Sequence, residues 1–175
     1  MSKNELSHKM LTQYIQETLK MGYVFTGDVK KIIDKTEKAK SAEIQFWRRL
    51  AVRTFIDYLE ALRLRLGFLV NQIITLRGDL DKPCPKPKKK KNLRFFFKEL
   101  AVVAQSTFEI KEDDKHFEDY YDTRKVRRRL THPRKLENLH VSWDEYIKAR
   151  EIYEWFDYCL KQINRQSSLF KKPRG

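Results

Sequence analysis

The sequence predicts an all-α fold, a single-domain antiparallel helical bundle that spans residues 1–175. Through most of the chain, apolar residues recur at every third or fourth position, which is the period of an amphipathic helix. Five glycines and five prolines are too few for the tight turns of an all-β fold. A hydrophobic content of 41% and an aromatic content of 13% argue against general disorder, and 175 residues are enough to bury a core.

In the N-terminal half, the apolar spacing predicts a first helix over residues 4–21. A break is expected at Gly22 and at the Thr26-Gly27-Asp28 run, because glycine lowers helix propensity. A short second helix should cover residues 29–36. A long helix is then expected from Ala42 to Leu76, with a bend at Gly67 and its arginines mostly on a solvated face.

Residues 78–92 are predicted to form a flexible Pro/Lys-rich loop within the single domain. Three prolines in five residues block helix and central strand, and the four consecutive lysines repel one another. Asn92 can cap the next helix, which carries Phe95, Phe96 and Phe97. Because three consecutive side chains cannot all face one direction, this helix should be buried over most of its surface.

Two further helices are expected in the C-terminal half. The first should begin near Asp113 and end near Thr131, because Pro133 disfavours the helical conformation at His132. The second begins at a capping box formed by Ser142 and Glu145. It continues with a stripe of apolar residues at alternating spacings of three and four: Tyr146, Ala149, Tyr153, Phe156, Leu160 and Ile163. Residues 166–175 should form a frayed basic tail.

The charge and the rarer residue types restrict the possible functions. The formal net charge of +14 and the pI of about 9.8 favour a polyanionic partner such as RNA, DNA, a nucleotide or an acidic protein. Two cysteines and four scattered histidines predict neither a disulfide framework nor a zinc site, and no metal or cofactor is expected. Without a signal-like N-terminus or an apolar stretch long enough for a membrane, we expect a cytoplasmic protein.

The segment from Arg124 to Lys135 is the strongest functional signal. It contains seven arginines and lysines, one histidine and no acid, and four residues separate Arg127 from His132. A guanidinium binds phosphate through a rigid fork of donors, and an imidazole exchanges protons near neutral pH. The pair can therefore activate the RNA 2′-hydroxyl and stabilise the phosphorane without a metal, leaving a 2′,3′-cyclic phosphate. A turn before Pro133 is needed to bring the two side chains together.

Around the candidate catalytic pair Arg127 and His132, other residues have supporting roles. Phosphate contacts are expected from five basic residues: Arg124, Arg128, Arg129, Arg134 and Lys135. Glu60 and Asp122 are candidates for orienting an arginine or the histidine. Arg134 and His140 form a second pair with similar spacing, although it lies across a predicted loop.

The segment from Arg127 to Pro133 resembles the R-x4–6-H motif of the HEPN superfamily, small helical bundles many of which are metal-independent ribonucleases. The resemblance extends to the long helix around Glu60 and to the closing helix, and Arg128 stands where the family often has a small polar residue. It implies an endoribonuclease that acts as a homodimer, with both motifs lining one cleft, in a toxin–antitoxin or phage-defence system with an antitoxin protein as a possible partner.

Two alternatives stay open on the sequence alone. One is a non-catalytic helical module that binds nucleic acid, a nucleotide or an acidic protein. The other is a structural interaction protein whose charge serves solubility. Binding that survives loss of His132, without cleavage, would distinguish the first alternative from the ribonuclease.

Overall fold

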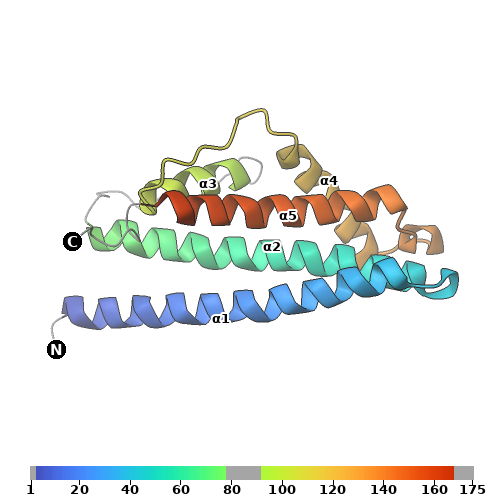
Figure 1. Cartoon of the computed structure of the whole chain (residues 1–175), viewed down its shortest axis with the longest axis horizontal. Helices are drawn as coiled ribbons and strands as arrows, with labels where there is room; N and C mark the ends of the chain where they lie inside the picture. Colours follow the sequence, from blue (N-terminus) through green and yellow to red (C-terminus); the bar gives the residue numbers. More distant parts are fainter. Residues whose placement is uncertain (1–2, 78–91, 168–175) are drawn as a thin grey trace. The chain divides into compact units, whose positions relative to one another are not determined.

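A computed structural model describes residues 3–77 and 92–167, and most of these residues are helical (Figure 1). In chain order the helices are α1 (Lys3–Lys38), α2 (Ser41–Arg77), α3 (Asn92–Val103), α4 (His116–Thr131) and α5 (Trp143–Gln166), with a 3-10 turn at Leu136–Leu139. The described ranges contain no strand, which confirms the all-α class; an isolated β-bridge joins Ser106 to Ser167. No helix in these ranges has both the length and the apolar character needed to cross a membrane.

The chain divides into two compact units, and each unit combines segments that are distant in the sequence. Of the described residues, unit 1 contains 3–20, 62–77, 92–114 and 158–167. Unit 2 contains 21–61 and 115–157, and therefore holds α4, the first half of α2 and most of α5. All the candidate site residues predicted from the sequence belong to unit 2. The single domain expected from the sequence stays a prediction.

The break expected within the first 38 residues is wrong, because α1 continues through it as one helix of 36 residues. Both glycines in the segment are helical, and a side chain at Gly22 or Gly27 would meet no other atom within 4 Å. The Thr26 hydroxyl donates a hydrogen bond of 2.8 Å to the Gly22 carbonyl one turn earlier. A glycine costs a helix only about 1 kcal/mol relative to alanine, which the packing of neighbouring residues such as the fully buried Val29 outweighs.

Aromatic rings from three helices form the centre of unit 2. Phe55 of α2 stacks on Tyr153 of α5 with ring centroids 5.6 Å apart, and Tyr58 lies 5.7 Å from the same ring. Phe25 of α1 lies 5.4 Å from Tyr58, and Phe55 also contacts Tyr146 at 6.4 Å. Phe55 contacts Tyr146, and the later residue Tyr58 contacts the later residue Tyr153. The helices α2 and α5 therefore run parallel within the unit, as Figure 1 shows. Burial of these rings stabilises the unit.

The predicted ends of the two C-terminal helices are largely confirmed. The helix α4 ends at Thr131, and the backbone N–H of His132 makes the last bond, 3.0 Å to the Arg128 carbonyl. It begins at His116 rather than near Asp113, and residues 112, 113 and 115 are in turns before it. At the start of α5, Ser142 and Glu145 exchange side chain to backbone bonds of 3.1 Å in both directions, which confirms the capping box.

In unit 1, α3 packs Phe96 and Phe97 inward, while Phe95 is 39% exposed, so burial over most of this helix is only partly confirmed. After α3, Gln105 adopts a left-handed conformation (φ 49°), and Ser106 donates a bond of 2.9 Å to the Ala101 carbonyl. Such a residue closes a helix C-terminus. The predicted loop at 78–92 lies outside the described residues, apart from Asn92 at the start of α3.

The beginning of the predicted frayed tail is ordered, contrary to expectation. Gln166 is the last residue of α5, and Ser167 is 1% exposed. Ser167 is held by its bridge to Ser106 and by a hydrogen bond from its hydroxyl to the Ala104 carbonyl. Residues 168–175 lie outside the described part of the chain.

Candidate nucleic-acid interface

One end of unit 2 gathers the start of α2, the end of α4 and the start of α5, together with the α4–α5 connection (residues 132–142). The first turns of α2 hold this connection through its backbone. The Gln45 side chain bonds both the carbonyl (3.2 Å) and the N–H (2.9 Å) of Val141, and Arg49 donates to the Leu139 carbonyl at 3.3 Å. The connection therefore has a defined conformation, although most of its side chains are exposed.

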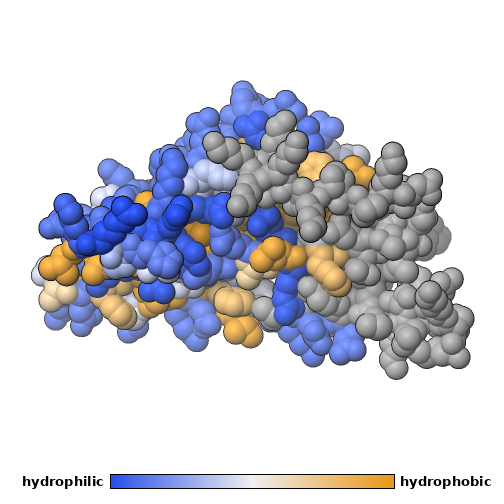
Figure 2. All heavy atoms as spheres, turned by 180° about the vertical axis from the view of Figure 1, so that it is seen from behind, coloured by the Kyte–Doolittle hydropathy of each residue, from blue (hydrophilic) through white to orange (hydrophobic). Residues whose placement is uncertain are grey.

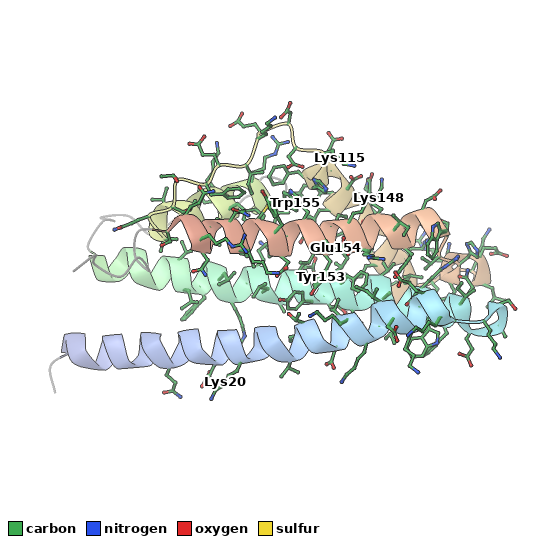
Figure 3. All side chains as sticks on the ribbon, in the orientation of Figure 1. Lys20, Lys115, Lys148, Tyr153, Glu154 and Trp155 are labelled. Carbon is green, nitrogen blue, oxygen red and sulfur yellow. The ribbon has the colours of Figure 1, made fainter. Side chains whose placement is uncertain are left out.

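The placement of the side chains around α4 follows from its amphipathic sequence. Phe117, Tyr120, Thr123 and Leu130 are buried, and this places the basic residues on the flanks of the helix and on its outer side. On the flank towards α5, Lys148 of α5 binds Asp119 at 2.9 Å and the Trp155 ring stacks on His116 with centroids 5.1 Å apart. Figure 3 shows Lys148 and Trp155 on the side of α5 that faces α4. The Asp119 carboxylate also raises the pKa of the Lys148 ammonium.

On the flank towards α2, two arginines of α4 pair with two acids of α2. Arg127 binds Asp57 through Nη2 at 2.7 Å and through Nε at 2.8 Å, and Arg124 binds Glu60 through Nε at 2.6 Å. The acids are three residues apart on one helix and the arginines three apart on the other, in opposite order, so α2 and α4 are antiparallel here. We call these two ion pairs the α2–α4 ladder.

Arg129 has a structural role at the base of the connection. Its Nη2 donates to both oxygens of Glu145, at 3.0 and 2.9 Å, and to the His140 carbonyl at 2.9 Å. Since Glu145 also accepts from the Ser142 backbone, one carboxylate joins the end of α4 to the cap of α5. Arg129 was predicted from the sequence to contact phosphate, but its Nη2 makes these contacts and its Nε is buried.

Several cations at this end keep side chains without a carboxylate partner, and we single out four: Arg128, Arg134 and Lys135, with Arg53 on α2 between the contacts of Arg49 and Asp57. All are exposed, and the described part of the chain contains no ion pair with any of them. The backbone N–H groups of Arg134 and Lys135 both bind the Asn138 side chain, at 3.0 and 3.1 Å, which turns the chain after Pro133. Two exposed acids, Glu137 and Asp144, lie nearby in the sequence, so the surface is basic without being uniformly so.

His132 is exposed at the end of α4. Within the described residues its ring has no hydrogen bond, ion pair or ring contact. The convergence of Arg127 and His132 expected from the sequence is not seen, because the guanidinium of Arg127 binds Asp57 instead. Arg128 precedes His132 by one helical turn, so this unpaired arginine is nearer in register.

The other predicted residues have identifiable contacts. Glu60 binds Arg124, one of the arginines predicted to contact phosphate. Asp122 binds Lys125 at 2.8 Å, and this hydrogen bond lowers the pKa of the Asp122 carboxyl. Asp122 thus contacts neither Arg127 nor His132 in the described structure. Arg134 and His140, the alternative pair, are both exposed and lie on either side of the 3-10 turn.

Exposed aromatic residues at the same end of unit 2 were missed by the sequence analysis. Trp143, the first residue of α5, is 45% exposed, and Phe46 near the start of α2 is 54% exposed. The Arg48 guanidinium carbon lies 5.1 Å from the centre of the Trp143 ring. Trp143 precedes Tyr146 of the apolar stripe by three residues, so its spacing predicts an inward position. The ring is nevertheless 45% exposed, although Arg48 lies over it.

Groups of three or more potential metal ligands are absent from the described ranges. Figure 2 shows hydrophilic side chains over much of the face that it draws, with smaller hydrophobic groups among them. Comparison of the chain with protein-family models, curated protein sequences and solved structures finds no match.

Proposed function

We propose that this chain is a helical module that binds RNA, with the binding surface at the end of α4 and along the α4–α5 connection. The observation that carries the proposal is the group of exposed cations without carboxylate partners, which we call the basic end: Arg53, Arg128, Arg134 and Lys135. Because phosphate binding releases counterions, unpaired cations contribute most to RNA affinity. The net charge of +14 supports the same class of ligand.

The ion pairs of unit 2 separate the cations available for binding from those with structural roles. Arg124, Arg127 and Arg129 each bind a carboxylate at 3.0 Å or less. A phosphate at one of these guanidinium groups must compete with that carboxylate for the same donors. The cations of the basic end carry no such competitor, so we place the main phosphate contacts there.

A charge-matched pair of variants tests this proposal. Arg128→Glu with Arg134→Glu reverses two charges in the basic end, whereas Lys30→Glu with Arg165→Glu reverses two exposed charges elsewhere on the helices. Fluorescence anisotropy with a labelled single-stranded RNA should show that the first variant loses RNA affinity by at least about tenfold and the second loses much less. Equal losses would mean that total charge, and not this surface, determines binding.

A second candidate function is a metal-independent endoribonuclease, which is what the resemblance to the HEPN superfamily implies. Its support is the exposed His132 imidazole at a helix end, one turn after the unpaired Arg128. Since one imidazole cannot be acid and base at once, the proposal includes a homodimer that brings two copies of His132 to one RNA. An antitoxin that covers this site is the corresponding partner.

Cleavage in EDTA tests the second candidate. The native chain should cut RNA and leave 2′,3′-cyclic phosphate ends, and His132→Ala should bind RNA without cutting it. Arg127→Ala and Arg128→Ala then show which arginine contributes to cleavage. Because the guanidinium of Arg128 has no carboxylate partner and that of Arg127 binds Asp57, we expect Arg128→Ala to lose more of the cleavage rate. If the native chain leaves RNA intact while binding it, the ribonuclease is excluded and the binding module stands.

A further inference from the structure

Two aromatic side chains near the basic end are exposed. Trp143 and Phe46 keep about half of their surface exposed, although burial of aromatic rings stabilises proteins. They belong to the first turns of α5 and α2, and contacts between these turns and the α4–α5 connection hold both at the end of unit 2 that carries the unpaired cations.

The Trp143 ring is fixed in position by its neighbours. The guanidinium of Arg48 lies over it at 5.1 Å from the ring centre, and the buried Tyr146 ring lies 5.2 Å away at an angle of 43°. Arg48 is itself oriented by a bond of 3.4 Å from Nη1 to the Val141 carbonyl. The indole therefore loses little conformational freedom when a ligand binds its open side.

The backbone that links Trp143 to the cations is also held in place by hydrogen bonds. The side chain of Gln45 bonds both polar groups of Val141, and the capping box fixes Ser142 immediately before the tryptophan. Arg134 and Lys135 lie earlier in the same connection, and their backbone N–H groups donate hydrogen bonds to the Asn138 side chain. The ring therefore follows directly on a connection of defined conformation that also carries these two cations.

We infer that Trp143, backed by Arg48, is a stacking platform for an unpaired base, and that the ligand of this surface is single-stranded RNA. This inference rests on the proposed RNA-binding function and adds the class of RNA. Cations in the connection bind the phosphates of the strand, while a base stacks on the indole, whose electron density the nearby guanidinium polarises. In a duplex the bases are already stacked on one another, so a duplex cannot use this ring.

The test compares three ligands and three proteins. The ligands are a single-stranded RNA oligonucleotide, a duplex RNA of equal length, and inorganic polyphosphate, which has charge but no bases. The proteins are the native chain, Trp143→Ala and Trp143→Phe. Loss of the ring should weaken binding of the single strand by about 5- to 100-fold and leave polyphosphate binding unchanged. Trp143→Phe should retain most of the affinity, because a phenyl ring also stacks.

Tryptophan fluorescence supplies an independent readout. The chain has three tryptophans, so Trp47→Phe is the matched control for Trp143→Phe. Quenching by the single strand should persist in Trp47→Phe and disappear in Trp143→Phe. Circular dichroism shows whether each variant is folded. If Trp143→Ala does not fold, Trp143→Phe keeps the test valid.

The outcomes distinguish the two proposals. If the native chain binds neither RNA nor polyphosphate, the RNA-binding function fails, and the stacking platform fails with it. If RNA and polyphosphate bind and Trp143→Ala weakens both equally, or neither, the RNA-binding function stands and the platform is overturned. The platform is also overturned if the native chain binds duplex RNA more tightly than single-stranded RNA. Quenching of tryptophan fluorescence that persists in Trp143→Phe overturns it as well.

Discussion

Arg127 of α4 and Asp57 of α2, which are 70 residues apart in the sequence, form an ion pair of 2.7 Å, and Arg124 and Glu60 repeat this contact one turn away. The α2–α4 ladder therefore neutralises two of the arginines in the most basic segment of the chain. It also sets the register between the two helices, since each arginine contacts one particular acid. The ladder provides the first prediction.

Asp57→Asn should strengthen RNA binding by about two- to fivefold, because it frees the guanidinium of Arg127 for phosphate. The slope of log affinity against log salt should become steeper by about 0.7, the value for one added phosphate contact with a single strand. The side chains of this pair are 34% and 48% exposed, so its loss should cost at most about 1 kcal/mol of stability. Titration with RNA at several salt concentrations measures both quantities.

Asp122→Asn is the matched control for this variant. It removes the same charge from α4, where Asp122 binds Lys125 on the outer side of the helix. A smaller gain for Asp122→Asn assigns the effect to Arg127. Equal gains would show that only the net charge of the chain matters.

A second prediction concerns Glu145, which accepts hydrogen bonds from Ser142 and Arg129 at once. Glu145→Ala removes part of the capping box and leaves Arg129 without its carboxylate. Loss of the cap costs about 1 kcal/mol, and loss of an ion pair whose side chains are 33% and 30% exposed costs up to about 1 kcal/mol, so we expect a combined destabilisation of about 1–2 kcal/mol. Urea unfolding measures this value, and Glu151→Ala, an exposed position on the same helix, should change stability by less than about 0.5 kcal/mol.

The continuity of α1 supplies a third prediction. Gly22→Ala and Gly27→Ala should each stabilise the protein by about 0.5–1 kcal/mol, because both positions are helical and a methyl group there meets no neighbour. Thermal unfolding followed by circular dichroism tests each variant and their combination. Destabilisation by either alanine would mean that the helix is interrupted there, as the sequence pattern alone suggested.

A fourth prediction follows from the buried hydroxyl of Tyr153 in the aromatic centre of unit 2. Burial, with a smaller contribution from Tyr58, raises the pKa of Tyr153 from 10.0 to about 12. The unfolded chain therefore loses this proton first, so stability is independent of this group below pH 10 and falls between pH 10 and 12. The slope contributed by one such group approaches about 1.4 kcal/mol per pH unit.

Tyr153→Phe should make this alkaline loss of stability shallower. The free energy of unfolding in urea, measured at pH 8, 9.5 and 11 for the variant and the native chain, tests the effect. Tyr158→Phe, at a 53% exposed position on the same helix, is the comparison. If both variants keep the native pH dependence, burial of Tyr153 is not its cause.

Local sequence patterns determined most of the secondary structure. The long helix expected over residues 42–76 is α2, the stop before Pro133 is the end of α4, and the capping box at Ser142 begins α5. These features depend on propensity, spacing and capping within a few residues, so they can be read from the chain directly. The expected break in α1 is wrong for a related reason: two glycines lower local propensity, but packing over the whole length of the helix decides its continuity.

Only the tertiary structure decided which basic residues are available at the candidate site. From the sequence, Arg124, Arg127, Arg128 and Arg129 are equivalent members of one basic run. Asp57 and Glu60, about 64–70 residues earlier, and Glu145, 16 residues later, select three of them for ion pairs and leave Arg128 exposed. Trp143 is likewise 45% exposed, although its spacing from Tyr146 predicts an inward position. Ion pairing and exposure are set by the register between helices, and composition and periodicity within one helix contain no information about that register.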